Sequence, residues 1–210
     1  MFVSLENMSR NLARPFCDDH SDEEPTMIDP HSATLFSGAA RGSECAFGTV
    51  AESYGITEVN FTFDGHAPER TRGLRKLAPD DLTLKDVSLH YVSRLMGRSY
   101  PDEPEFCRLL QSICWQVASG REVFVIGEIM PDGTVKGGTG WGAEFAKICN
   151  KPLYVFDQIK GEWFRWDNRW LPVRSAVISR ETFTGTGTRT LNETGLNAIH
   201  QLFERSFLRR

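Results

Sequence analysis

Hydrophobic residues follow two spacings along this chain, one typical of strands and one typical of helices. Four short segments are apolar or alternate between apolar and polar residues, which is the pattern of β-strands; they span residues 33–37, 58–63, 121–127 and 152–156. Elsewhere, apolar residues recur every three or four positions, as on one face of an amphipathic helix. A strand, a helix and a strand in succession indicate parallel pairing. The pattern therefore predicts an α/β fold, with a doubly wound, mostly parallel sheet and helices on both faces.

Three further segments add detail to this fold. The pattern of residues 80–97 predicts a single amphipathic helix. Four aromatic residues surround Asp-Asn within residues 160–173, which predicts a small Trp-rich β-hairpin. Such a hairpin covers an edge of the core, makes a dimer contact or offers a stacking platform for a base. Residues 181–207 predict a strand, a loop rich in Gly and Thr, and a helix that starts with a capping box of Thr190 and Glu193.

The first 32 residues differ in composition from the rest of the chain. Five acidic residues fall within positions 18–24, and three prolines punctuate the segment. It therefore offers little apolar surface to bury. Residues 1–32 are predicted to be a disordered acidic tail, and residues 33–210 to form one domain.

Composition narrows the classes of function. The net charge of −4 argues against a general nucleic-acid-binding protein. Five cysteines without a CxxC pair indicate reduced thiols and no zinc site. No apolar run approaches the length of a membrane span, and the first residues lack the hydrophobic segment of a signal peptide. The sequence thus predicts a cytoplasmic protein with no metal, no cofactor and no membrane contact; a homo-oligomer is compatible with it.

Three glycine-rich turns each lie between a predicted strand and a predicted helix: SGAARGS at 37–43, GGTG at 137–140 and GTGTR at 185–189. Strand-to-helix turns of a parallel sheet meet at the carboxyl edge of the strands. Helix N-termini offer N–H groups to phosphate, and glycine lets the backbone approach it closely. Arg41 and Arg189 can bind phosphate with two parallel hydrogen bonds. Each turn alone is equally well explained as a tight turn, but together they predict a phosphate-binding site.

These turns resemble motifs of one superfamily. GGTGWGAE, at 137–144, resembles the G-G-x-G-T-x-x-E motif of the lonely-guy and lysine-decarboxylase-like proteins of the SLOG superfamily. LFSGAARGSECAFG, at 35–48, resembles the first strand and loop of other SLOG members, and FTGTGTR, at 183–189, resembles a loop of the DNA-processing-protein-A branch. The resemblance covers most of residues 33–208, and the combination is also similar to small phage and bacterial proteins. It implies a Rossmann-like sheet and a nucleotide or nucleotide-derived ligand held through its phosphates.

The resemblance leaves two functions open. One is a binding module that senses or captures a nucleotide-derived ligand. The other is a nucleoside 5′-monophosphate N-glycosidase, a phosphoribohydrolase, in which Glu144 stands in register with the catalytic carboxylate. A helix-start Glu is the plain alternative for that residue. The catalytic arginine is Arg41, Arg94 or Arg98. Trp141 replaces the threonine of the motif, which favours the binding module. The predicted ligand-binding residues are Gly38, Arg41, Gly42, Ser43, Asp64, Gly137, Gly138, Thr139, Gly140, Trp141, Gly185, Gly187, Thr188 and Arg189.

Other candidates are weighed against structural roles. Asp64 follows the second predicted strand, where an acidic residue either binds ribose hydroxyls or forms a turn. His66 and His90 are interpreted as structural or surface histidines, and Cys45 as a small core residue. Trp141 either stacks on a base or ribose, or packs. The four basic residues within 70–76 suggest a nucleic-acid contact, against which the acidic composition argues.

Overall fold

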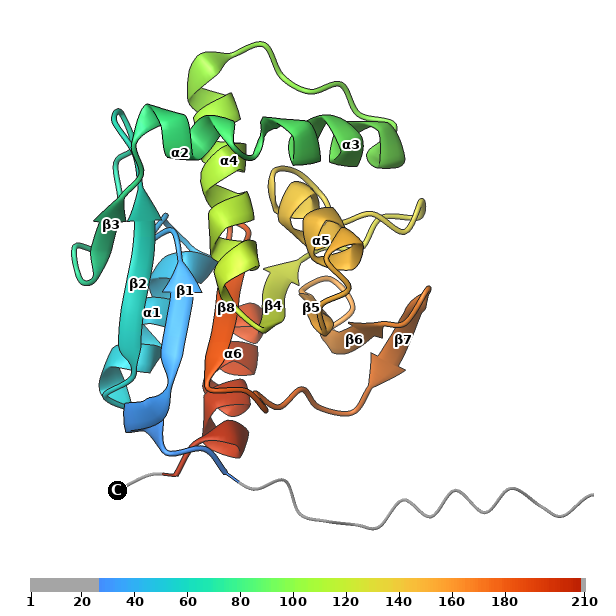
Figure 1. Ribbon diagram of the computed structural model, residues 1–210. Helices are drawn as coiled ribbons and strands as arrows, with labels where there is room; N and C mark the ends of the chain where they lie inside the picture. The colour runs from blue at the N-terminus through green and yellow to red at the C-terminus, as the bar shows by residue number, and fades with distance from the viewer. Residues whose placement is uncertain (1–26, 209–210) are drawn as a thin grey trace, which may run out of the picture.

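The computed structural model describes residues 27–208 (Figure 1). Within them, eight strands form one sheet in the order β3-β2-β1-β8-β4-β5-β6-β7. The strands from β3 to β5 in this order pair in parallel, and β6 and β7 add an antiparallel edge. The predicted α/β class is confirmed, and the architecture is Rossmann-like. The strands are β1 Thr34–Ser37, β2 Thr57–Thr62, β3 Leu74–Lys76, β4 Glu122–Gly127, β5 Leu153–Asp157, β6 Glu162–Trp166, β7 Trp170–Val173 and β8 Thr182–Gly187.

The chain leaves the centre of the sheet in two opposite directions. From β1 it crosses through helix α1 (Ser43–Ser53) to β2, on one side. From β4 it crosses through helix α5 (Thr139–Ile148) to β5, on the other side. Strand β8 lies between β1 and β4 and pairs with both. The carboxyl ends of β1, β8 and β4 therefore form the switch point, where sheets of this kind bind ligands.

Helices cover both faces of the sheet, as predicted. Helix α1 and helix α6 (Glu193–Ser206) contact each other and lie on one face. Helix α4 (Pro104–Ser119) and helix α5 lie on the other face, and helix α3 (Asp86–Met96) packs across them. A five-residue helix, α2 (Pro79–Thr83), contacts α4, and a short 3-10 helix, Pro30–Ser32, precedes β1.

Strand β4 shows how the sequence creates these two layers. All six of its residues are buried, as expected for a central parallel strand with a continuous apolar run. Phe124 and Ile126 pack in the cluster formed with α1 and α6. Val123 and Val125 point to the opposite face and pack with α3, α4 and α5. Alternate side chains of one strand thus join two separate cores.

Two local predictions are wrong. The helix predicted over 80–97 is two helices, α2 and α3, because Leu82 packs near β2 while Leu89 packs with α4 and α5. The predicted capping box at Thr190 is replaced by a cap at Asn192, whose Oδ1 accepts a hydrogen bond from Gly195 N at 2.8 Å. An Asn side chain is among the strongest caps, so the helix starts two residues later than Thr190 would place it.

The domain begins before the predicted boundary at residue 33. Ile28 forms a parallel bridge with Phe207 and donates its N–H to Ser206 O at 2.9 Å. Pro30 is buried. Residues 27–32 therefore belong to the folded domain rather than to the tail, because Ile28 adds to the core between the sheet and α6. The rest of the predicted tail lies outside the described residues.

The predicted Trp-rich hairpin is confirmed. Strands β6 and β7 pair in antiparallel fashion, with Trp166 opposite Trp170. The amine of Lys147, on α5, lies over both indole rings, 3.7 Å and 4.9 Å from their centroids. The hairpin thus covers the β5 edge of the core; a dimer contact there stays a prediction. Within residues 27–208, no helix is both long and apolar enough to cross a membrane.

Candidate functional site

The three glycine-rich turns meet at the carboxyl edge of the sheet. Both N and Oγ of Ser43, in the first turn, donate to the carbonyl of Thr188 in the third, at 3.0 Å and 2.9 Å. The N–H of Thr188 in turn donates to Ile126 O of β4, at 2.9 Å. The second turn follows β4 and leads into α5. The first and third turns, whose residues Ser43 and Thr188 are 145 positions apart, are therefore held together by direct hydrogen bonds.

A cleft opens beside these turns and consists of two adjoining cavities. The larger has a volume of about 1130 Å³ and the smaller about 670 Å³. Ala40, Phe106, Leu109, Arg189 and Thr190 line both, so the cavities are continuous. The smaller cavity is lined by residues of all three turns. The larger lies between the first turn, the loop after β2 and the start of α4.

The second turn presents the start of α5 to the smaller cavity. Gly137, Gly138 and Thr139 line that cavity, and among the described residues no side chain caps the helix. Gly137 has φ +68°, which glycine adopts at little cost. Arg98 holds the turn in place, because its guanidinium donates to Val135 O and Gly137 O, each at 3.3 Å, and to Thr134 Oγ1. Arg98, one of the three candidate catalytic arginines, thus positions the turn.

The third turn requires glycine for packing as well as for access. Gly187 has φ +155°, and a β-carbon there would collide with the carbonyl of Ile126. Gly187, Thr188 and Arg189 line the smaller cavity, and Arg189 also lines the larger. Arg41 and Gly42, of the first turn, line the larger cavity. Two of the predicted phosphate-binding arginines therefore face the same cleft.

Several predicted ligand-binding residues lie within the packing around the turns, away from both cavities. A β-carbon at Gly38 would meet Gln116, one at Gly140 would meet the carbonyl of Val135, and one at Gly185 would meet the ring of Phe47. These three glycines allow close packing between elements and do not line the cleft. Ser43 is buried and bonded to the third turn. Its role is to hold the two turns together.

Trp141 and Asp64 also have other partners. Trp141 is 4% exposed and packs against Tyr100, with ring centroids 5.9 Å apart. Of the two roles predicted for it, the structure gives it packing. Asp64 forms an exposed ion pair with Lys76, at 2.6 Å, and is not among the residues that line the larger cavity. The placement of Asp64 at the ligand is therefore wrong, and its role in the turn after β2 remains.

Glu144 does not reach the cleft. Its carboxylate accepts a hydrogen bond from Lys147 Nζ at 2.6 Å, and this amine also lies over the tryptophans of the hairpin. Among the described residues, those lining the two cavities do not include Glu144. Glu144 lies five positions after Thr139 in α5, so the two side chains leave the helix in directions about 140° apart. Thr139 lines the smaller cavity, and Glu144 therefore points away from it. The expectation that Glu144 faces the ligand pocket is wrong.

The cleft contains a different buried carboxylate, Glu44, which the sequence interpretation missed. Glu44 lies in the first turn of α1, is 6% exposed and lines the smaller cavity. Its oxygens accept from Ala40 N at 3.1 Å and from Thr186 Oγ1 at 2.8 Å, and the backbone of Gly38 also bonds to it. Burial raises the pKa of Glu44 above its usual value, against the opposing effects of these bonds and of the Arg189 charge.

His66 is a second group in the cleft whose importance was underestimated. It lines the larger cavity and stacks on Phe63, with ring centroids 4.9 Å apart. Thr62 Oγ1 lies 3.1 Å from its Nδ1. Burial, and next the positive charge of Arg189, lower the pKa of His66 below its ordinary value. His66 is therefore mainly a neutral imidazole at neutral pH, positioned beside two arginines.

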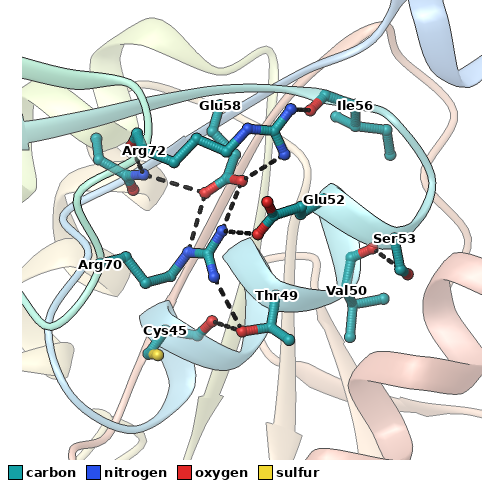
Figure 2. A network of polar contacts seen from close by, with 10 residues as sticks. Cys45, Thr49, Val50, Glu52, Ser53, Ile56, Glu58, Arg70 and Arg72 are labelled. Carbon is teal, nitrogen blue, oxygen red and sulfur yellow. Dashed lines mark hydrogen bonds and ion pairs between the residues drawn. The ribbon is translucent and has the colours of Figure 1, made fainter.

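The wall of the larger cavity is fixed by a buried ionic network (Figure 2). The carboxylate of Glu58, on β2, accepts from Arg70 at 2.8 Å and 3.2 Å and from Arg72 at 3.0 Å. Arg70 also binds Glu52 of α1 at 2.9 Å, and Glu69 N bonds to Ala39 O of the first turn. These contacts fold the loop 64–73 back over β2 and α1.

The same network accounts for the basic residues in 70–76. Arg70 and Arg72 are paired with Glu58, and Lys76 with Asp64. Arg75 lies over the ring of Phe61, 5.7 Å from its centroid. A nucleic-acid contact needs charges that face solvent. The loop therefore offers less basic surface than its sequence suggests.

The fold and the cleft define a class, that of Rossmann-like α/β proteins with glycine-rich turns at the switch point of the sheet. No family model, no curated protein and no solved structure matches the chain. Among residues 27–208, no group of three or more His, Cys, Asp or Glu side chains is placed to hold a metal ion. Function therefore has to be argued from the cleft itself.

Proposed function

We propose that the cleft binds a nucleotide or nucleotide-derived small molecule through its phosphate, and that the protein acts as a sensor or capture module. The observation that carries this proposal is the meeting of three glycine-rich turns, from adjacent strands, around one cleft. Switch points of parallel sheets are the usual ligand sites of such folds. The resemblance of the turns to SLOG motifs is part of the proposal.

The two cavities suit the two ends of a nucleotide. A phosphate fits the smaller cavity, where the start of α5 and Arg189 supply N–H groups and positive charge. The larger cavity offers the apolar side chains of Phe63, Phe106 and Leu191 beside His66. Aromatic rings and an apolar side chain are typical of the part of a site that holds a base, and the charged residues that also line this cavity, Arg41, Glu69, Glu103, Glu105 and Arg189, can bond to polar groups of the base. The combined volume exceeds what a mononucleotide needs.

Between the two predicted functions, the geometry supports the binding module. An N-glycosidase that uses Glu144 needs this carboxylate beside the sugar, where it stabilises positive charge at the anomeric carbon. The pairing of Glu144 with Lys147, outside the cleft, removes it from that position. Arg41 faces the larger cavity and serves in the proposal as a ligand-binding residue.

The test is isothermal titration calorimetry of the purified protein with the four ribonucleoside 5′-monophosphates, with native mass spectrometry for any nucleotide that copurifies. We expect at least one to bind, and Arg189→Ala to weaken its binding about 10- to 100-fold through the loss of a charge-assisted hydrogen bond. Arg94→Ala is the matched control, because Arg94 is exposed on α3 and is not among the residues that line the cavities.

Three results separate the possibilities. Absence of binding by every nucleotide contradicts the proposal. Equal losses in Arg189→Ala and Arg94→Ala contradict the assigned site. Release of free base by the wild-type protein, followed by chromatography and unchanged in Glu144→Gln, would establish an enzyme with another catalytic residue.

A further inference from the structure

The first glycine-rich turn already holds an anion, the carboxylate of Glu44. Ala39 adopts φ +57°, and the turn directs the backbone N–H groups of Gly38 and Ala40 toward this carboxylate. Consecutive N–H groups in such a turn form a concave site that binds anions. Thr186 Oγ1, from β8, completes the cradle at 2.8 Å. The place where a ligand phosphate was expected is therefore occupied by the protein itself.

The remaining hydrogen-bonding capacity of Glu44 defines what can approach it. A carboxylate accepts about four hydrogen bonds. Ala40 N and Thr186 Oγ1 donate two of them. Since Glu44 lines the smaller cavity, its remaining acceptor capacity is available to a ligand. A hydroxyl or amino group can donate to it, whereas a second phosphate would place two negative groups side by side.

The other charges of the smaller cavity do not change this conclusion. Lys136 and Glu128 also line it but neutralise each other in an ion pair of 2.7 Å. Arg189 lines both cavities and attracts Glu44. Within the smaller cavity, the unpaired positive charge therefore lies at Arg189 of the third turn, and the negative charge at Glu44, directly after the first turn.

We propose that Glu44 determines ligand specificity: the cleft takes a ribonucleoside monophosphate, with one phosphate at the second and third turns and a ribose hydroxyl donating to Glu44, and rejects compounds with a second phosphate in place of that hydroxyl. This inference rests on the proposed function. Glu44 acts here as a binding residue, and no chemical step is assigned to it.

The experiment compares ligands that differ at one sugar position. The probes are the adenosine, guanosine, cytidine and uridine 5′-monophosphates, their 2′-deoxy and 3′-deoxy forms, and their 2′,5′- and 3′,5′-bisphosphates. Dissociation constants are measured for wild type, Glu44→Gln and Glu193→Gln. The last is the matched control, because Glu193 also lies in the first turn of a helix but is exposed and is not among the residues that line the two cavities.

We expect the wild-type protein to bind the ribonucleoside monophosphate at least about tenfold more tightly than either its 2′-deoxy or its 3′-deoxy form. The bisphosphate that carries its second phosphate at the same sugar position should bind more weakly by at least the same factor. Glu44→Gln should narrow both differences, and Glu193→Gln should leave them unchanged. The comparison among ligands with wild type decides the question even if Glu44→Gln does not fold.

Other outcomes overturn the inference in distinguishable ways. Equal binding of the monophosphate and both of its bisphosphates, or of both deoxy forms, refutes the role of Glu44 and leaves nucleotide binding intact. Differences that persist unchanged in a folded Glu44→Gln protein assign the specificity to another residue. Failure of every nucleotide to bind refutes the proposed function and this inference with it.

Discussion

Replacing Glu58 with Gln should destabilise the protein and loosen the wall of the larger cavity. The side chain of Glu58 is fully buried on β2. It accepts two hydrogen bonds from Arg70, one from Arg72 and one from Asn60 (Figure 2). Burial disfavours the charge on Arg70, but its bonds to Glu58 and Glu52 raise its pKa above the ordinary value. Arg70 stays charged when the carboxylate is removed, because an arginine side chain keeps its proton at neutral pH even without a partner.

The size of the expected loss in stability depends on how far solvent reaches the side chains of Arg70 and Arg72. Removal of one partner from a buried ion pair costs about 3–5 kcal/mol when the other charge stays buried. The Arg70 side chain is 12% exposed and keeps its bond to Glu52, whereas the Arg72 side chain is 40% exposed and is largely screened by solvent. We therefore expect a loss of about 2–3 kcal/mol, which lowers the melting temperature of a domain of this size by about 4–12 °C.

Thermal and urea unfolding measure the loss, and amide hydrogen exchange measures opening of the loop 64–73. Glu52→Gln is the control, because the Glu52 side chain is 57% exposed and binds the same Arg70. It should change the melting temperature little and leave exchange in the loop unchanged. If Glu58→Gln is as mild as Glu52→Gln, the network does not hold the cavity wall and the reasoning fails.

Two other predictions concern α4 and the cleft. The Lys151 amine donates to the carbonyls at the end of α4, those of Val117, Ala118 and the C-cap Gly120. Lys151→Met should therefore lower the urea midpoint by the equivalent of about 1.5–3 kcal/mol. Lys160→Met, at a side chain that is half exposed, should leave the midpoint unchanged. In the folded protein the pKa of His66 lies below its ordinary value of 6.5, first because of burial and then because of the Arg189 charge. The unfolded state therefore binds the proton more readily than the folded state. His66 thus contributes stability above pH 6.5, and this contribution is lost as the pH falls below 6.5. His66→Gln should flatten that fall in melting curves recorded at successive pH values, and an unchanged slope would contradict the assignment.

The central strands and the turns could be predicted because local sequence determines them. The run at β4 is apolar at nearly every position, and Gly42 of the first turn and Gly187 of the third stand where a β-carbon would collide with backbone. Strand β3 was not predicted. All three of its residues, Leu74–Lys76, are exposed, and backbone pairing with β2 defines the strand without a buried side chain. No hydrophobic pattern marks such an edge strand.

The turns lie together at one edge of the sheet, as the sequence predicts, whereas Glu144 lies outside the two cavities. The motif fixes where Glu144 falls along α5 but not which face of the helix meets the cleft. That face depends on the burial of Trp141 against Tyr100, which the motif cannot show. Glu44 appears in the sequence as an ordinary acid at a helix start. Its role depends on Thr186, which is 142 residues away, and on the left-handed backbone of Ala39.

Because the buried carboxylate in the cleft is Glu44 and not Glu144, the three turns are not equivalent. Their similar sequences suggest three equivalent phosphate sites, yet the first turn already binds the buried carboxylate of Glu44 through Ala40 N, whereas the third turn carries Arg189 and the second leads into the start of α5, which no side chain of the described residues caps. Two unit charges about 4 Å apart repel by about 4 kcal/mol at an effective dielectric constant of 20. Even half of that energy lowers affinity about thirtyfold. A phosphate beside an ionised Glu44 would therefore move to Arg189 and the start of α5, so that the first turn contributes selectivity, and the other two contribute affinity.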